Sequence, residues 1–462
     1  MIKIDKEKTL TKRLAINWAL RASATLLSSV LLLTDLQAAV TPEQASRLKN
    51  DLTPLGAIRS ANFDGSIPAW NLDKINQDEH IKWINDIEKE QPLFIINHNN
   101  MNQHHKFLSP GLIKLLTLYP KTFQIPVYPS HRTARLPDWL YENAYKNALE
   151  AKISEHGDSV TFAWPSTPFP IPKTAEEVMW NHELRWKGLF FKLKTIEAIV
   201  NRDGSYNLIH NKLEVYSVYH NRHRPREIDD WRYTYYLSYI KAPAMVAGGA
   251  YLSHESMKPT IHPRQSWMYV AGQRRMRRSP VMGYDSPTFT SDGFRMMDEI
   301  DVFNGALDRY EWSLQGVKEI YVPYNNMRLQ QALVDDTKII TPHHINPDYT
   351  RYEKHRVWVV DSVLKPGKEH IYKRRTFYLD EDTWGILLVD IYDNDNSLWR
   401  VTQRYATYYE SVPVTFSALD SHSDLKKKSY YIQGFPAGYE HSYEPPPKGY
   451  FSPTMVRQRL HR

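Results

Sequence analysis

The chain has 462 residues, of which 42% are hydrophobic and 24% charged, so a folded globular protein is expected. Cysteine is absent, which excludes a disulfide framework, thiolate metal sites, iron–sulfur clusters and a cysteine nucleophile. The formal net charge is +7, but six of the 59 Lys and Arg residues and three of the 52 acids fall within residues 1–38. The rest of the chain is only weakly basic, so its charge gives no reason to expect a nucleic-acid partner.

Residues 1–38 have the pattern of a secretory signal peptide. Basic residues run to Arg21, an apolar stretch covers Ala22 to Leu33, and small residues follow at Ala38 and Ala39. The apolar stretch is shorter than the roughly 20 residues that span a bilayer. We therefore expect export to the periplasm after cleavage at Ala38 or Ala39, and the alternative is a retained N-terminal anchor.

Residues 39–188 are expected to form a region of helices and loops that packs on a sheet. Helix starts are indicated by Thr41-Pro42, in which Thr is the N-cap and Pro the first helical residue, and by Ser109-Pro110. Helical spacing of apolar residues continues each pattern. One predicted helix begins at residue 41. Three others cover Ser109–Leu118, Pro137–Ala151 and Thr174–Trp186.

Residues 189–435 change character and read as short alternating runs between turn signals. The predicted strands are Leu213–Tyr219, Trp231–Lys241, Gln265–Val270, Lys318–Tyr324, Arg356–Leu364, Ile371–Leu379, Gly385–Tyr392, Leu398–Tyr409 and Ser429–Phe435. Many strands without long helices between them indicate one large antiparallel sheet. The expected fold class is therefore mainly β, of the α+β type, with helices covering the sheet. Residues 436–462 are expected to form a Pro-rich, basic tail.

Several motifs spread along the chain resemble a bacterial family known as domain of unknown function 1329 (DUF1329). The motifs that carry this resemblance are Leu52–Gly56 (LTPLG), Asn62–Trp70 (NFDGSIPAW), Val127–Ala134 (VYPSHRTA), Pro168–Lys173 (PFPIPK), Met179–His182 (MWNH), Ala271–Arg278 (AGQRRMRR), Asp301–Gly305 (DVFNG), Tyr321–Asn325 (YVPYN) and Asn346–Glu353 (NPDYTRYE). The resemblance covers nearly all of the chain that follows the signal segment.

A more distant resemblance links two strand units to the periplasmic lipoprotein-sorting proteins. The units are Trp267–Val270 leading to Arg274-Arg275, and Phe377–Asp380 with Trp384–Ile386. The resemblance implies a strongly curved antiparallel half-barrel, covered by helices, that holds lipid or acyl chains on its concave side. It also implies a periplasmic location, with an exporter of the resistance–nodulation–division type or an outer-membrane protein as partner.

Aromatic and aliphatic residues alternate along several predicted strands and suggest an apolar lining. The candidate lining residues are Trp231, Tyr233, Tyr235, Leu237, Trp267, Tyr269, Phe377, Leu379, Leu387, Val389, Trp399 and Val401. One interpretation is a concave wall for a lipid or sterol-like ligand. The alternative is an ordinary core beneath the covering helices, and the sequence leaves both open.

A basic hairpin is the second candidate site. Arg274, Arg275, Arg277 and Arg278 lie within five residues, where they could meet lipid phosphates or an acidic partner. The alternative is a charged strand that protects the edge of a sheet from pairing.

No pattern predicts catalysis, a metal or a cofactor. The nucleophile elbow, the zincin motif, the Walker loop and the dinucleotide fingerprint are absent from the sequence. His98, His104 and His105 lack the spacing of metal ligands, and the run Asp380–Asp382 falls at a predicted turn, where carboxylates bond backbone N–H groups.

The preferred hypothesis is a non-enzymatic periplasmic carrier or adaptor for a lipid-like molecule that works with an envelope export system. The alternatives are a structural subunit of an envelope complex without a ligand, and an envelope hydrolase with an unrecognised site. A continuous apolar tunnel would favour the carrier, and a filled core with a large exposed apolar patch would favour the structural subunit. A cleft with convergent polar groups of shifted pKa would favour the hydrolase.

Overall fold

The computed structural model describes residues 40–224, 231–279, 283–436 and 439–460. The predicted signal segment lies outside the described residues. Within the described part, none of the helices combines the length and the apolar character that a membrane crossing requires.

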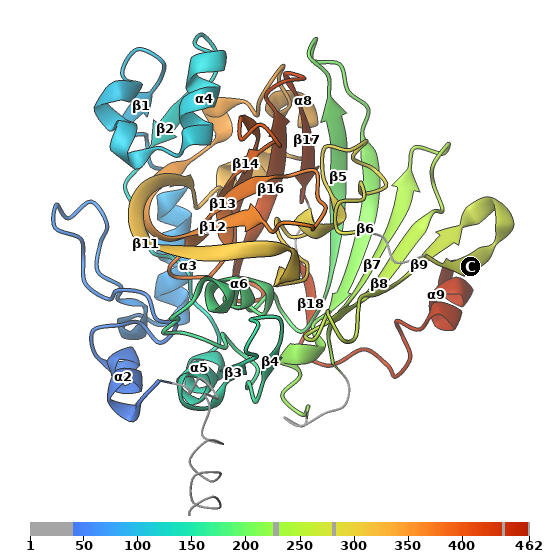
Figure 1. Cartoon of the computed structure of the whole chain (residues 1–462). Coiled ribbons are helices and arrows are strands. Elements are labelled where there is room, and N and C mark those ends of the chain that lie inside the picture. Colours follow the sequence, from blue (N-terminus) through green and yellow to red (C-terminus); the bar gives the residue numbers. More distant parts are fainter. Residues whose placement is uncertain (1–39, 225–230, 280–282, 437–438, 461–462) are drawn as a thin grey trace, which may run out of the picture. The chain divides into compact units, whose positions relative to one another are not determined.

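One open sheet of 16 strands organises the described chain (Figure 1). Its neighbouring strands pair antiparallel, apart from a one-residue parallel contact of β2 with β12. The expected fold class, a large antiparallel sheet with covering helices, is confirmed. The main path runs in the order β1 (Phe94–Ile96), β2 (Ile125–Val127), β12 (Tyr352–Leu364), β13 (Arg374–Asp380), β14 (Ile386–Tyr392), β15 (Leu398–Tyr409), β16 (Val414–Asp424), β17 (Ser429–Gly434), β5 (Phe190–Val200), β6 (Ile209–Tyr216), β7 (Arg232–Ala242), β8 (Ala250–Ser256), β9 (Gln265–Val270) and β10 (Arg275–Arg278).

Two strands join this sheet off its main path, and two form a separate hairpin. β11 (Tyr310–Pro323) pairs with β12 along its whole length, and β18 (Glu440–Ser442) pairs with β5. β3 (Lys152–Ile153) and β4 (Val160–Thr161) pair only with each other. The predicted run Ile371–Tyr409 is confirmed as the meander β13–β14–β15, whereas β11 starts earlier than the predicted Lys318.

Helices and short 3-10 turns fill the connections between the strands. The helices are α2 (Pro42–Ser46), α3 (Gln77–Ile87), α4 (Pro110–Leu118), α5 (Asp138–Glu150), α6 (Ala175–Glu183), α7 (Met327–Ala332), α8 (Asp336–Ile339) and α9 (Pro453–Leu460). The predicted starts are confirmed by capping: Thr41, Ser109 and Thr174 each accept a hydrogen bond from a backbone N–H in the first turn. Thr174 and Glu177 form a capping box.

Side chains alternate between two buried faces of the sheet. We call the face that is covered by α4 the outer face, and the face that is covered by α6 the inner face. The outer face includes Val401, Leu419 and Ile432, and it packs against the apolar side of α4, where Leu112 and Leu115 are fully buried. The inner face includes Phe377 and Val389, and it packs against α6 and the segment 296–307. Both faces of the meander β13–β15 are therefore buried.

The C-terminal segment covers the outer face of β6–β9. Phe451 and Val456 pack against Leu237 and Leu252 in one cluster. Arg459 of α9 donates to Glu214 of β6 at 2.7 Å. The expected Pro-rich tail thus ends in a helix that lies over the sheet near β9 (Figure 1).

The start of α4 is held to the outer face by Asp390 of β14. Its Oδ1 accepts hydrogen bonds from the Gly111 backbone N–H at 3.0 Å and from Ser109 Oγ at 3.2 Å, and Tyr378 donates to Oδ2 at 3.1 Å. A Cβ at position 111 would lie 2.2 Å from Oδ1, so this approach requires glycine. Burial raises the pKa of Asp390 to about 7.

We expect Asp390→Asn to increase stability at high pH. A carboxyl whose pKa is raised in the folded state costs stability as pH rises from about 4 through 7, and Asn does not titrate. Asn also keeps an acceptor for Gly111 and gains a donor for the Tyr378 hydroxyl. In urea unfolding, the variant should match the wild type near pH 4 and exceed it by about 1–4 kcal/mol at pH 8. A difference that is independent of pH would contradict this assignment.

Candidate functional site

Two neighbouring cavities lie on the inner face of β5–β9. The first has about 150 Å³ and the second about 70 Å³ of space for the centre of a water molecule. Tyr236 and Ile300 border both cavities, so the two lie next to each other. At about 10–15 Å³ for each water on this scale, they hold roughly 15 to 22 waters together. That space is comparable to the volume of an acyl chain.

Strand alternation explains which side chains form the cavity wall. On β7, Thr234, Tyr236 and Ser238 point inward, and Leu213 and Val215 do so on the neighbouring β6. The wall of the second cavity also contains Phe191, Leu193, Phe416 and Phe435. Charged residues, among them Lys187, Asp301 and Arg404, form the other part of that wall, so apolar and polar groups share this pocket.

The covering loop, which we define as residues 283–309, closes the cavities on the side away from the sheet. Phe289, Arg295 and Ile300 of this loop border the first cavity. Polar contacts hold the loop to the sheet: Arg295 donates to Gln433 at 2.8 Å, and Arg264 donates to Asn304 at 2.8 Å. Near its middle, Asp298 is paired with Arg375 at 2.8 Å. Hydrogen bonds and ion pairs thus hold the loop together with the buried apolar side chains Met296, Phe303 and Leu307.

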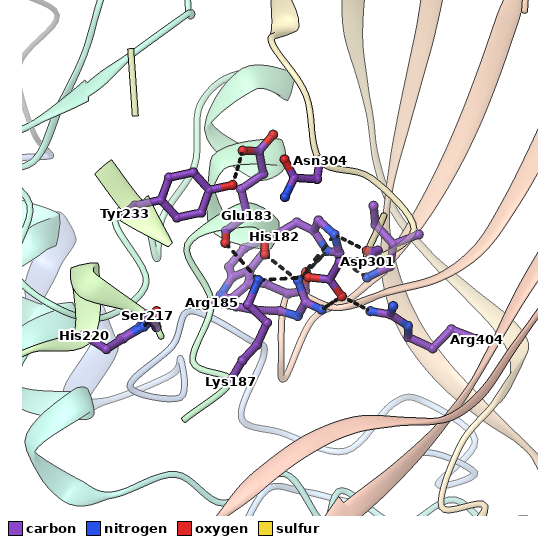
Figure 2. Close-up of polar contacts among 12 residues, drawn as sticks. His182, Glu183, Arg185, Lys187, Ser217, His220, Tyr233, Asp301, Asn304 and Arg404 are labelled. Carbon is purple, nitrogen blue, oxygen red and sulfur yellow. Dashed lines mark hydrogen bonds and ion pairs between the residues drawn. The ribbon is translucent and has the colours of Figure 1, made fainter. Parts of the chain in front are cut away.

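Asp301 of the covering loop is the centre of an ionic cluster with three cations (Figure 2). Arg185 and Arg404 donate to its Oδ1 at 2.6 and 2.8 Å, and Lys187 donates to Oδ2 at 2.9 Å. Arg404 also forms two hydrogen bonds of 2.9 Å with Asp420 of β16. Burial opposes the ionisation of Asp301, but the three cations outweigh it and hold its pKa well below the ordinary value.

Two residues at the end of α6 complete the cluster in uncharged forms. His182 Nδ1 accepts from the Ile386 N–H at 3.1 Å, so Nε2–H donates to the Asp301 carbonyl at 3.1 Å. Burial lowers the pKa of His182 well below its ordinary value. Burial raises the pKa of Glu183 to about 8, and the Glu255 carboxylate adds to the shift. Glu183 is therefore protonated at neutral pH, where Tyr233 and the Gly305 N–H contact its oxygens.

The structure distributes the predicted lining residues over several buried clusters. Tyr235, Leu237, Trp267 and Tyr269 lie on the outer face with Phe451. A second group packs on the inner face beneath α6, a third lies against α4, and Trp231 stacks on His262. Those groups are Tyr233, Phe377, Leu379, Val389 and Trp399 beneath α6, and Leu387 and Val401 against α4. Of all the predicted residues, Tyr269 alone borders either of the two cavities.

Irregular strand pairing explains part of this distribution. A register shift between Arg232 and Thr234 leaves Tyr233 opposite no partner, and its hydroxyl contacts Glu183 on the inner side. A second register shift lies on β14, opposite the step from Tyr378 to Leu379 on β13. It places Leu387 and Val389 on different faces of the sheet. Regular alternation would place Tyr233 on the same face as Tyr235, and Leu387 on the same face as Val389. The sequence interpretation assumes this regular alternation.

The predicted basic residues lie at the free edge of the sheet. Arg274 has φ 51° in the turn that follows β9, and Arg275, Arg277 and Arg278 are exposed on β10. Met276 packs in the outer cluster with Trp267. In the described part of the chain, the guanidinium groups of these arginines form no ion pair.

A second buried polar cluster surrounds the turn after β13. Among the described residues, His355, Asp380 and Asp382 form the group with ligand atoms close enough, within 4.8 Å, to hold a metal ion. However, Asp382 is bound by Arg132 through hydrogen bonds of 2.6 and 2.8 Å, and His355 contacts Glu353 at 3.1 Å. These groups neutralise one another, which favours an internal ion-pair network. The predicted turn is present, but its carboxylates are buried and mostly bind cationic side chains.

Sequence reasoning missed the ionic cluster and the side of β7 that faces the cavities. Arg185, Lys187, Asp301 and Arg404 are separated in the chain, and no spacing rule connects them. The motif Asp301–Gly305 is the feature of the sequence that could have indicated the cluster, because Asp301 stands there before apolar and turn residues. For β7, alternation defined two faces but did not indicate which one lines a cavity.

We expect Asp301→Asn to destabilise the protein by about 3 kcal/mol, because it leaves buried cations without their shared carboxylate. Guanidinium unfolding would measure the loss, and the exposed Asp335→Asn is a matched control that should leave the unfolding free energy unchanged. Equal stability of Asp301→Asn and the wild type would contradict a structural role for this cluster.

Comparison with known proteins places the chain in a family. It is 38% identical over 444 residues to the uncharacterized protein PA3922 of Pseudomonas aeruginosa, covering 93% of this chain and 96% of that one. Two solved structures are similar at lower identity. One is a putative outer membrane lipoprotein-sorting protein domain from Vibrio parahaemolyticus, at 13% identity and a TM-score of 0.42, covering 61% of this chain and 97% of that chain. The other is a DUF1329 family protein from Desulfovibrio piger, at 16% identity and a TM-score of 0.40, covering 58% and 90%. Residues 95–457 match the family described as "Protein of unknown function (DUF1329)", and the chain therefore belongs to the DUF1329 family.

Proposed function

We propose that this protein is a non-enzymatic periplasmic carrier for a lipid-like hydrophobic molecule. The observation that carries the proposal is the pair of cavities between the inner face of β5–β9 and the covering loop. Apolar side chains form much of their walls, and the loop that closes them is held in part by polar contacts, which can be exchanged for water. The signal-like N-terminus supports a periplasmic location.

The proposed mechanism is passive. The covering loop opens, the ligand enters against the aromatic and aliphatic side chains of the inner face, and the loop closes again. An envelope partner then receives or supplies the ligand, and an exporter of the resistance–nodulation–division type or an outer-membrane protein fits that role. The alternative, a structural subunit without a ligand, is decided by the experiment below.

The experiment compares two tryptophan substitutions on adjacent residues of β7. Ser238 faces the first cavity, and Tyr239 points to the outer face near α9. Ser238→Trp should fill the cavity and reduce binding of a fluorescent fatty acid at least about tenfold, since burial of the chain is the main driving force. Tyr239→Trp should bind as the wild type does. Native mass spectrometry of the wild type from periplasm, without detergent, would identify a bound lipid.

Two results would count against this proposal, the first against the carrier function and the second against the site on the inner face. A wild-type protein that neither co-purifies with a lipid nor binds the fluorescent probe would favour the structural subunit. A loss of binding in Tyr239→Trp alone would move the site to the outer face, where the sequence-based lining residues gather. Circular dichroism and thermal unfolding of both variants would exclude misfolding as the cause.

The exposed turns after β7 and β9 support a second part of the proposal. Through these turns the protein docks on an anionic lipid surface during transfer. The turns after β7 and β9 are adjacent, because a Cβ on Gly248 would lie 3.1 Å from the Cβ of Ala271. Met245 is 91% exposed on the first turn, and Arg274 belongs to the second. Arg275, Arg277 and Arg278 follow beside them on β10. Exposed apolar residues among cations suit a membrane surface that carries negative charge.

Substitution of Arg275, Arg277 and Arg278 by Gln should weaken binding to phosphatidylglycerol vesicles at least about tenfold, because each cation contributes about 1 kcal/mol near such a surface. Co-sedimentation measures this, with phosphatidylcholine vesicles as the neutral reference. The matched control replaces the exposed Lys74, Lys114 and Lys121 by Gln. If both triple variants lose binding equally, the effect is one of net charge and the hairpin has no special role.

A further inference from the structure

The ionic cluster beside the second cavity carries an excess positive charge. Arg185, Lys187 and Arg404 face two carboxylates, Asp301 and Asp420. The neighbouring groups do not cancel the excess. Burial raises the pKa of Glu183 and lowers that of His182, so it favours the uncharged form of both. The pair of Glu255 and Arg264 is neutral within itself.

Lys187 is the cation through which this excess reaches the cavity. It borders the second cavity together with Asp301 and Arg404. Its ammonium has three N–H groups, and in the described part of the chain it has two acceptors: Asp301 Oδ2 at 2.9 Å and the Glu183 carbonyl at a long 3.4 Å. Burial lowers the pKa of Lys187, so a further anion at this position would relieve an electrostatic cost.

The cavity wall also has an unpaired polar group near the charged end. Thr234, which is 6% exposed, borders the second cavity, and its hydroxyl has no hydrogen-bond partner among the described residues. A buried hydroxyl without a partner costs free energy that a polar group of a ligand would recover. The opposite part of the space, in the first cavity, is bordered by Ile240, Met268 and Phe289. Glu197 and Arg295 also border it, and both are hydrogen-bonded to Gln433. The space therefore has one end with an excess of cations and one end that is more apolar.

We propose that the ligand of this carrier is a long-chain anion, whose single anionic head group binds Lys187 beside Asp301 while its apolar chain lies against β7–β9. This inference rests on the carrier function proposed above and adds the chemical class of the ligand. A single negative charge balances the excess of the cluster, and a fatty carboxylate is the simplest molecule of this kind. A neutral molecule of the same length fills the apolar end but does not balance the positive charge at the other end.

The experiment compares decanoate with 1-decanol by isothermal titration calorimetry, because the two differ only in the head group. The wild type should bind decanoate at least about tenfold more tightly than 1-decanol, as expected for a charge-assisted hydrogen bond. Lys187→Gln should abolish most of that preference, and Lys187→Arg should restore part of it. Lys194→Gln is the matched control. Lys194 is exposed on β5, the strand that follows Lys187, and it borders neither cavity.

Each outcome separates this inference from the carrier function. Equal affinity of the wild type for decanoate and 1-decanol would overturn the anionic head group and leave the carrier intact. Failure to bind either molecule would count against the carrier itself. Retention of the preference in Lys187→Gln would overturn the assignment to Lys187. The wild-type comparison does not depend on how well the variants fold.

Discussion

A sheet of 16 strands that carries apolar side chains on both faces must be covered on both faces, and this constraint shapes the rest of the chain. On the outer face, α4 and the C-terminal α9 supply apolar cover to separate parts of the sheet. On the inner face, α6 packs against β11 and β12 and joins the apolar cluster of β13 and β14, but β5–β9 are covered by a loop. A loop has no continuous apolar stripe, so cavities remain beneath it. The candidate site thus lies where a packed helix is replaced by an irregular segment.

Buried charges hold that irregular segment in place. A loop cannot satisfy its polar groups as a helix does, and the covering loop instead places Asp298 and Asp301 against arginines from the sheet and from the chain that follows α6. Such pairs contribute less net stability than apolar packing, because both ions lose their hydration. Together with the buried apolar side chains Met296, Phe303 and Leu307, they specify one position for the loop.

Much of the architecture could be predicted from local patterns, whereas the site could not. Ser109-Pro110 and Thr174 with Glu177 specify helix starts through contacts within one turn, so the sequence alone identifies them. The meander β13–β15 follows from alternation and turn residues. By contrast, Tyr233 and Leu387 leave their expected faces at irregularities of strand pairing, which depend on the partner strand. Arg185, Asp301 and Arg404 meet only through the tertiary fold.

The pairing of β17 with β5 has a consequence for the order in which the chain can fold. Tyr430 of β17 lies opposite Val200 of β5, and the residues between them include most of the sheet. Strands β5–β10 can form hairpins early, but they join β12–β16 only after almost the whole chain is available. The aromatic outer face of β7–β9 waits still longer, since Phe451 and Val456 cover it. A chain that is interrupted before its last residues therefore presents an uncovered aromatic surface, and rapid completion protects it from aggregation.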